Sequence, residues 1–323
     1  MKVLVTGGAG FIGSHTVERL LTAGHEVTVL DDLSTGSRAN LATVEHDVEL
    51  LVGDIADPAA VTRAAAGCEV VVHLAAVASV EASVRDPLRT NRTNLTGTIN
   101  VFDAAARAGA RRVVYASSAA VYGEATDLPI REDAVKRPMS PYAIDKLAGE
   151  YYLAHFQRSG AFSGTAFRFF NVYGPRQDPS SPYSGVISVF LDRAKRGKGV
   201  TIYGDGSQTR DFVYVKDLVD VLLLAVHERP GHGPGAAQDG TPAEAGPTAI
   251  NLASGGSVDL LTLVATVAEA AGLQEPMAVE FGPARQGDIT RSQADVTALR
   301  ERFGRVPSTA LTDGLAATFR SLS

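Results

Sequence analysis

The first 31 residues constrain this chain most, because they place a glycine-rich turn between two short apolar runs. Residues 2–6 have the composition of a buried strand, and a helical pattern of Val17, Leu20 and Leu21 follows the turn. A second strand-like run, residues 26–30, ends at a pair of aspartates. The order strand, glycine turn, helix, strand is typical of a unit that binds the pyrophosphate of a dinucleotide.

Each glycine of the turn is needed for a different physical reason. Gly8 and Gly10 lack side chains where backbone N–H groups would close on phosphate oxygens, and Gly13 lets the helix pack closely on the strand. The start of the helix supplies partial positive charge for the anion. The residues expected to contact the cofactor here are Gly7, Gly10, Phe11, Ile12 and Gly13.

The two aspartates indicate which dinucleotide fits. An acidic residue at the end of the second strand accepts hydrogen bonds from both adenosine ribose hydroxyls and repels a 2′-phosphate. We therefore expect Asp31, with Asp32 beside it, to select NAD over NADP.

Charge and cysteine content exclude several classes of protein. With 30 Lys and Arg against 36 Asp and Glu, the net charge is −6 without a basic block, so neither nucleic acid nor a membrane is an expected partner. The single Cys68 excludes an intrachain disulfide and a cysteine-based zinc site, and no metal site is expected. Because residues 1–2 lead straight into the first strand and no apolar run is long enough to span a bilayer, we expect a cytoplasmic protein.

Strand-like and helical patterns alternate over the first half of the chain. Further strands are expected at 50–52, 70–74, 112–116 and 165–169, and helices at 58–65, 88–108 and 141–158. This alternation predicts an α/β fold, a doubly wound parallel sheet of the Rossmann type over 1–169, rejoined by about 212–228. A smaller, mixed C-terminal domain is expected over 170–211 and 229–323, with helices at 259–271 and 311–322 and a Gly/Pro/Ala-rich surface insertion at 229–248.

Two further segments carry residues suited to proton transfer. Ser117 and Ser118 follow the strand at 112–116, at the carboxyl end of the sheet, where open α/β sheets bind ligands. Tyr142 and Lys146 are one turn apart at the start of a helix and therefore share a face. A tyrosine is a poor base at its usual pKa of about 10, but a nearby ammonium and a positive nicotinamide ring favour the phenolate. We expect Tyr142 to act as base, Ser118 to align the substrate hydroxyl, and Lys146 to supply charge and hold the nicotinamide ribose.

With these residues the chain resembles the extended short-chain dehydrogenase/reductase family, and within it the nucleotide-sugar 4-epimerases of the UDP-galactose 4-epimerase type. The resemblance covers almost the whole length. It is carried by residues 7–13, 53–55, 73–76, 117–118, Tyr142 with Lys146, 169–175, 202–206, 209–212 and 285–288.

The resemblance implies further contacts with NAD and with a UDP-sugar. It places Asp54 and Ile55 around the adenine, and residues 74–76 with Asn94 beside the pyrophosphate and ribose. The remaining cofactor set that it implies is Asp54, Ile55, Leu74, Ala75, Ala76, Asn94, Ser117, Tyr142, Lys146 and Phe169. The implied UDP-sugar set is Ser118, Tyr142, Asn171, Tyr203, Arg210, Arg285, Asp288 and Ser292.

The residues after Ser118 select among the reactions of this family. By resemblance, 4,6-dehydratases place an Asp-Glu pair there and UDP-glucuronate decarboxylases keep a glutamate, whereas this chain has Ala119 and Ala120. Alanine can neither remove nor supply a proton, so elimination is not expected. What remains is oxidation at C4, rotation of the 4-keto sugar and return of hydride to its other face, with NAD regenerated in each cycle.

Two positions bear on the sugar. Asp178 stands where, by resemblance, glucuronate epimerases place an arginine, and its charge would repel a uronate. Ser292 stands where narrow-specificity relatives have a bulky tyrosine, which leaves room for an N-acetyl group. We expect UDP-glucose and UDP-galactose as substrates, with the N-acetyl forms in addition. The alternatives are a UDP-glucuronate 4-epimerase, an epimerase acting at another carbon, and a catalytically silent NAD-binding regulator. The resemblance also implies a homodimer formed through the helices at 88–108 and 141–158.

Overall fold

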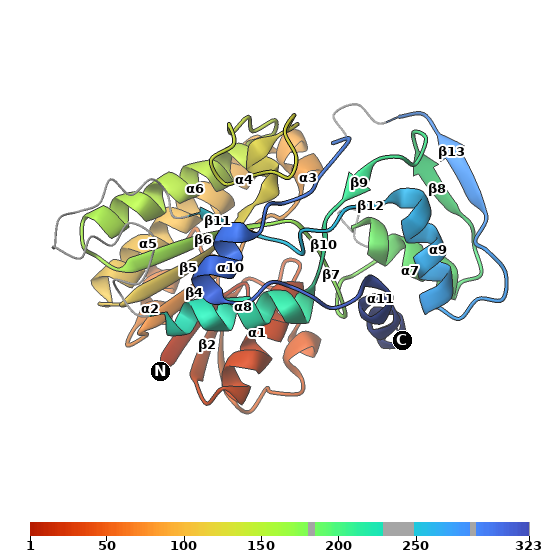
Figure 1. The fold of residues 1–323 in the computed structure, drawn as a ribbon. Helices are drawn as coiled ribbons and strands as arrows, with labels where there is room; N and C mark the ends of the chain where they lie inside the picture. Colours follow the sequence, from red (N-terminus) through yellow and green to blue (C-terminus); the bar gives the residue numbers. More distant parts are fainter. Residues whose placement is uncertain (180–184, 229–248, 285–288, 323) are drawn as a thin grey trace.

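A computed structural model describes residues 1–179, 185–228, 249–284 and 289–322 of the chain. Within these ranges the centre of the fold is a seven-stranded sheet in the order β11-β6-β5-β4-β1-β2-β3, and every neighbouring pair is parallel (Figure 1). Its strands are β1 (Lys2–Thr6), β2 (Glu26–Asp31), β3 (Val48–Val52), β4 (Val70–His73), β5 (Arg112–Ser118), β6 (Ser163–Phe169) and β11 (Ala249–Leu252). The prediction of a doubly wound parallel sheet is confirmed.

The strands predicted over residues 1–169 are all present, and the differences lie at their ends. β5 continues beyond the predicted end at Ala116, because β6 pairs with it as far as Ser118 opposite Phe169. Both serines therefore stand on the strand itself, at the carboxyl edge of the sheet.

Helices cover both faces of the sheet (Figure 1). On one face α1 and α8 pack against each other and α10 contacts α8, while on the other α5 lies between α2 and α6. These helices are α1 (Phe11–Thr22), α8 (Val215–His227), α10 (Thr297–Phe303), α2 (Pro58–Ala65), α5 (Gly97–Arg107) and α6 (Pro141–Arg158). Short segments at the carboxyl edge are η1 (Arg38–Leu41), α3 (Val80–Arg85) and η3 (Ala119–Tyr122).

The helix predicted at 88–108 is divided in the structure. It consists of α4 (Pro87–Asn91), a π-helical turn η2 (Arg92–Thr96) and α5. Asn94 lies in the π turn, where its side chain accepts a hydrogen bond from Val77 N at 2.8 Å and donates one to Val77 O at 3.1 Å. The wider turn thus holds Asn94 against the loop that follows β4, and hydrophobic periodicity does not encode such a turn.

The remaining elements form a smaller mixed region, seen on the right of Figure 1. Among its described residues there are three two-stranded pairs: β7 with β10 and β8 with β13 are parallel, and β9 with β12 is antiparallel. Helix α9 packs against both α7 and α11. The bounds are β7 (Asn171–Tyr173), α7 (Val186–Lys195), β8 (Val200–Tyr203), β9 (Thr209–Arg210), β10 (Phe212–Tyr214), β12 (Val258–Asp259), α9 (Leu260–Ala270), β13 (Val279–Gly282) and α11 (Leu311–Ser321).

Strand β11 belongs to the large sheet, although it comes from the range predicted for the second domain. The sequence pattern assigns 229–323 to the second domain, yet β11, which comes from that range, pairs with β6 at the edge of the large sheet. Helix α10, from the same range, contacts β11. After leaving the sheet at the end of β6, the chain therefore returns to it twice, first with α8 and then with β11 and α10. The predicted insertion at 229–248 lies outside the described residues.

Apolar side chains form one cluster on each face of the sheet, because successive residues of a strand point to opposite faces. On β1, Val3 and Val5 belong to the larger cluster and Leu4 to the smaller one. The larger cluster continues through Tyr214 to Leu263 of α9, so the sheet and the mixed region share a core. Along the described part of the chain, no helix combines the length and apolarity needed to cross a membrane.

Candidate active site

The glycine turn lies between the carboxyl end of β1 and the start of α1. A side chain at Gly13 would collide with the carbonyl oxygen of Gly7, and one at Gly7, whose φ is +71°, would lie 2.7 Å from the backbone nitrogen of Ala75. Gly10 precedes α1 without a side-chain cap, and the first turn holds no acidic residue. The N–H groups at the start of the helix, from Phe11 on, are thus suited to an anion, and the turn fits a dinucleotide pyrophosphate.

Asp31 ends β2 beside this turn. Its carboxylate accepts hydrogen bonds from the backbone N–H groups of Ala9 and Leu33, both at 2.9 Å, which hold it against the glycine turn. Burial raises the pKa of the carboxyl above its usual value, and these two hydrogen bonds oppose the shift. Each oxygen keeps a second lone pair for a ribose hydroxyl. Asp32 instead accepts hydrogen bonds from the backbone N–H and hydroxyl of Ser34, within its own exposed turn.

The other predicted cofactor residues follow neighbouring strands at the same edge. Asp54 and Ile55 come after β3, and the buried Ile55 side chain packs so closely on α5 that a side chain at Gly97 would lie 2.7 Å from it. Residues 74–76 follow β4, where Ala75 N donates to Thr6 Oγ1 at 3.3 Å. Phe169 ends β6. The cofactor roles of all these residues stay predictions.

Ser118 and Tyr142 meet at the carboxyl end of β5. Ser118 is the last residue of the strand, and Tyr142 stands in the first turn of α6, which begins at Pro141 behind the capping side chain of Ser140. Burial raises the pKa of the Tyr142 phenol, and a hydrogen bond with Ser118 opposes this. In the protein alone the phenol is therefore held protonated, next to the hydroxyl with which it is expected to act.

Lys146 lies one turn further along α6 and is almost fully buried. Its ammonium donates a hydrogen bond to Ala116 O at 2.7 Å and lies 5.9 Å from the centre of the Tyr142 ring and 5.1 Å from that of Tyr115. Burial lowers the pKa of Lys146 to about 8, against a smaller opposing effect of the Asp145 charge. The structure thus brings together the three residues predicted to carry out proton transfer.

The predicted UDP-sugar residues lie on segments of the mixed region. Asn171 begins β7, Tyr203 ends β8, and Arg210 lies on β9, where its guanidinium donates to Thr209 O at 2.9 Å. Ser292 is buried, and its N–H donates to the same Thr209 O at 3.2 Å, which places it beside β9, the strand that carries Arg210. The predicted residues Arg285 and Asp288 lie outside the described residues.

Sequence reasoning missed Asp211, which organises this side of the site. Its fully buried carboxylate accepts hydrogen bonds from the N–H and hydroxyl of Ser254 and from the N–H groups of Gly255 and Ala294, at 2.7 to 3.2 Å. Burial raises its pKa, and these bonds oppose the shift. Asp211 thus joins the strand that carries Arg210 to two distant segments. The sequence signal that could have pointed to Asp211 is its position next to Arg210 and directly before the apolar strand β10.

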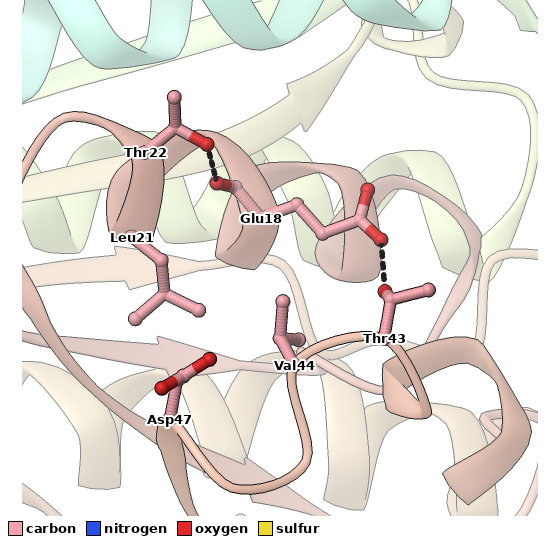
Figure 2. Close-up of a pocket in the computed structure, with 6 residues that line it drawn as sticks. All are labelled: Glu18, Leu21, Thr22, Thr43, Val44 and Asp47. Carbon is pink, nitrogen blue, oxygen red and sulfur yellow. Dashed lines mark hydrogen bonds between the residues drawn. The ribbon is translucent and has the colours of Figure 1, made fainter.

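A surface hollow elsewhere on the molecule contains none of the predicted site residues. It is lined by Glu18, Leu21, Thr22, Thr43, Val44 and Asp47, on the outer side of α1 (Figure 2). Two hydrogen bonds join its lining residues: Thr43 Oγ1 donates to Glu18 Oε1 at 2.8 Å, which connects the loop before β3 to the helix, and Thr22 Oγ1 donates to Glu18 O at 2.8 Å. The hollow offers no arrangement of acid, base and hydroxyl comparable to the one at the end of β5.

Residues 3–236 match the NAD dependent epimerase/dehydratase family, a span that holds the glycine turn, Asp31 and the Ser118–Tyr142–Lys146 group. The chain belongs to this family. The suspected family and the NAD cofactor are therefore confirmed, as is the expectation that the protein is an enzyme of the epimerase class. NAD supplies such enzymes with a reversible hydride acceptor.

Three similar proteins match the chain over almost its whole length. A UDP-glucose 4-epimerase of Mycolicibacterium smegmatis is 41% identical and covers 98% of this chain and 97% of its own. Among solved structures, a UDP-glucose 4-epimerase of Thermotoga maritima with UDP-glucose has a TM-score of 0.88 at 35% identity, covering 99% and 98%. A UDP-N-acetylglucosamine 4-epimerase of Methanobrevibacter ruminantium, in complex with UDP-N-acetylmuramic acid, has a TM-score of 0.89 at 34% identity, covering 99% and 97%.

Proposed function

We propose that this protein is a UDP-sugar 4-epimerase that interconverts UDP-glucose and UDP-galactose and also accepts the N-acetyl forms. Support for the UDP-sugar class comes from full-length relatives that are named as 4-epimerases of UDP-glucose and of UDP-N-acetylglucosamine. The names of the same relatives support C4 as the reacting carbon. The placement of Ser118, Tyr142 and Lys146 at the carboxyl edge of the sheet supports proton removal from a sugar hydroxyl.

Each of the three residues has a distinct task in this proposal. Tyr142 removes the proton from the C4 hydroxyl and returns it after the sugar has turned, while Ser118 aligns that hydroxyl through a hydrogen bond. Lys146 holds its positive charge near the phenol, which favours the phenolate that the protein alone disfavours. NAD, when bound, supplies the hydride acceptor at C4.

The observation that carries the choice of epimerisation is the absence of an acid or base directly after Ser118. Ala119 and Ala120 begin the short helix η3, and Ala120 N donates to Ser118 Oγ at 3.2 Å. By resemblance, these are the two positions at which 4,6-dehydratases carry the acid–base pair that elimination needs. A 4-keto sugar formed here has no group at these positions to take a proton from C5.

Two residues support the choice of sugar. Ser292 is small and lies on the segment joined to Thr209, next to the substrate residue Arg210. Asp178 is exposed in the segment after β7, and its negative charge disfavours the carboxylate of a uronate. We therefore propose neutral hexoses, with room for an N-acetyl group.

A panel of UDP-sugars tests this proposal. The purified protein is assayed with UDP-glucose, UDP-galactose, both N-acetyl forms and UDP-glucuronate, without added NAD, after the nucleotide released from a denatured sample has been identified. We expect inversion of the neutral sugars, and a loss of at least about a hundredfold in kcat for Tyr142→Phe with the fold retained. Turnover of UDP-glucuronate alone would establish the uronate alternative, and bound NAD without turnover of any sugar would establish the silent regulator.

We also propose that the protein works as a homodimer. The outer faces of α3, α4 and α6, which contact one another, expose large apolar side chains: Val84 (63%), Leu88 (83%), Ile144 (52%) and Tyr151 (59%). Large apolar side chains exposed together on neighbouring helices are typical of an interface, and two copies of this face would cover each other.

A further inference from the structure

A buried ion pair lies directly behind the proposed catalytic group and has no part in the proposed proton transfer. Glu150 and Arg168 have side chains that are 0% and 1% exposed. The guanidinium holds the carboxylate in a two-point contact, with Arg168 Nε 2.9 Å from Oε1 and Nη2 2.7 Å from Oε2. Such two-point geometry fixes orientation as well as distance.

This pair ties together the two elements that carry the catalytic hydroxyls. Glu150 is one turn after Lys146 and two turns after Tyr142 on α6. Ser117, next to Ser118 on β5, donates its hydroxyl to Glu150 Oε1 at 2.5 Å. Arg168 stands opposite Ser117 in the register of β5 with β6. One carboxylate therefore connects the strand of Ser118 to the helix of Tyr142.

The guanidinium is itself fixed from its other side. Arg168 Nη1 donates to Tyr122 OH at 2.8 Å and to Glu132 O at 2.9 Å, and the Tyr122 hydroxyl donates to Asn251 Oδ1 at 2.6 Å. Asn251 in turn donates to Ile130 O and Asp295 O. The chain of contacts thus runs from the catalytic strand to the segment that follows Ser292.

A fully buried ion pair contributes little net stability, because the cost of desolvating both charges offsets their attraction. The pair matters more for the relative placement of the groups that it joins, because proton transfer requires donor and acceptor within hydrogen-bond distance and in line. We propose that Glu150 and Arg168 are positioning residues, which hold the end of β5 against α6 so that Ser118 and Tyr142 face the same substrate hydroxyl. This inference rests on the proposed function.

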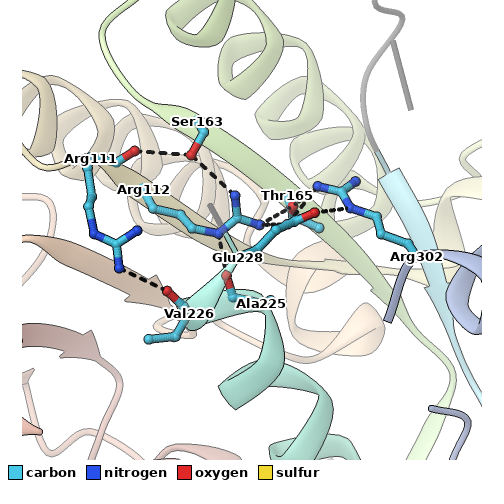
Figure 3. A network of polar contacts seen from close by, with 8 residues as sticks. All are labelled: Arg111, Arg112, Ser163, Thr165, Ala225, Val226, Glu228 and Arg302. Atoms are coloured by element: carbon cyan, nitrogen blue, oxygen red, sulfur yellow. Dashed lines mark hydrogen bonds and ion pairs between the residues drawn. The ribbon is translucent and has the colours of Figure 1, made fainter. Parts of the chain in front are cut away.

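The opposite ends of the same strands contain a matched control (Figure 3). Arg112 at the start of β5 and Arg302 of α10 both bind Glu228, at the end of α8, and both donate to Thr165 Oγ1 of β6 at 2.8 Å. The side chains of Arg112, Glu228 and Arg302 are 2%, 10% and 6% exposed. Glu150→Gln removes the carboxylate that pairs with Arg168 of β6, and Glu228→Gln removes the carboxylate that pairs with Arg112 of β5 and Arg302 of α10. Both substitutions thus leave a buried arginine of the sheet unpaired, but only the first does so behind the catalytic group.

The first measurement compares steady-state kinetics and thermal unfolding of the wild type, Glu150→Gln and Glu228→Gln as purified holoenzymes. We expect both variants to unfold at lower temperature. Glu150→Gln is expected to lose about tenfold in kcat with KM for the UDP-sugar within about twofold, because misalignment affects the chemical step rather than binding. Glu228→Gln is expected to keep both constants. Equal loss of kcat in the two variants would overturn the proposal.

A second measurement does not depend on turnover and uses a variant that changes no charge. Ser117→Ala removes the hydroxyl that joins β5 to Glu150, and the ionisation of Tyr142 is followed by phenolate absorbance as the difference from Tyr142→Phe in the same background. Because the hydrogen bond from Ser118 favours the phenolate, its loss on misalignment raises the titration midpoint. We expect a higher midpoint in Ser117→Ala than in the wild type, and an unchanged midpoint would overturn the proposal.

The two measurements separate this inference from the proposed function. If the wild type turns over no UDP-sugar, the proposed function fails, and the tyrosine titration still decides the role of the pair. If the wild type is active and Glu150→Gln does not fold, Ser117→Ala carries the kinetic comparison, with the same expected fall in kcat at unchanged KM. Wild-type kinetics in Ser117→Ala would then overturn the positioning role.

Discussion

At the scale of single residues, His73 shows how a buried polar group is fixed by its partners. Thr98 Oγ1 donates to Asn94 O at 2.5 Å and therefore accepts from His73 Nε2 at 2.9 Å. Thr6 Oγ1 then donates to Nδ1 at 2.6 Å. This pattern is satisfied by a neutral ring with its proton on Nε2. Burial, and to a smaller extent the nearby charge of Lys146, lowers the pKa of His73 to about 3.

The lowered pKa of His73 predicts a component of acid instability. The unfolded chain binds a proton at this residue below about pH 6.5, whereas the folded chain does so only near pH 3. Stability from this group is therefore complete above pH 6.5 and is lost as the pH falls toward 3, with a slope of up to about 1.4 kcal/mol per pH unit. The unfolding free energy of the wild type and of His73→Gln between pH 4 and 8 measures this component, which the variant should lack. Nitrogen NMR should show an Nε2–H ring that does not titrate between pH 5 and 8, and a midpoint near 6.5 would contradict the assignment.

At the scale of elements, the packing of α1 on the glycine turn sets a strict limit on side-chain size. A methyl group at Gly13 would meet the carbonyl oxygen of Gly7 and the Cα of Gly8, both of which are backbone atoms that cannot turn aside. We expect Gly13→Ala to displace the start of α1, to cost about 1–3 kcal/mol or more in stability, and to yield protein without bound NAD. The nucleotide released per chain on denaturation measures the second effect.

Gly24→Ala is the matched control for this substitution. Gly24 has φ of +79° just after the same helix, but a side chain there would meet nothing within 4 Å. The control thus carries the conformational cost of about 1 kcal/mol without a collision, and it should retain NAD. If Gly13→Ala retains as much NAD as Gly24→Ala, the close approach of α1 to the turn is not what the cofactor requires.

Elements with strong local signals were predictable from the sequence. Helices α2 and α6 have the predicted bounds, because each begins with a capping Asp57 or Ser140 followed by proline. β11 was not predictable, since its place at the edge of the sheet depends on pairing with β6 rather than on its own composition. The π turn around Asn94 likewise depends on its contacts with Val77.

The residues of the candidate site likewise fall into those that the sequence predicts and those that it does not. Ser118, Tyr142 and Lys146 were found because each lies in a short segment whose spacing is meaningful by itself. Asp211 and the Glu150–Arg168 pair were missed, since a buried carboxylate acquires its role from donors that are remote in sequence. Residue spacing thus predicts the reacting groups, whereas the contacts that hold them require the three-dimensional fold.

At the scale of the whole molecule, the exposed apolar face of α3, α4 and α6 predicts the state of assembly. Leu88 of α4 is 83% exposed on this face, so a charge there would have to be buried in the proposed dimer. We expect light scattering at micromolar concentration to give twice the chain mass for the wild type and a single chain mass for Leu88→Glu.

Phe281 of β13 provides the control for this experiment, because it is 60% exposed in the mixed region, away from the proposed interface. Phe281→Glu introduces the same charge into a similarly exposed apolar position and should leave the dimer mass unchanged. A monomeric wild type, or a dimeric Leu88→Glu, would contradict the interface.

Because α6 carries Tyr142 and Lys146 on its inner side, a dimer formed through its outer side would also restrain the helix that bears the proposed catalytic group. The monomeric variant should then show a lower kcat, whereas Phe281→Glu should keep the wild-type value.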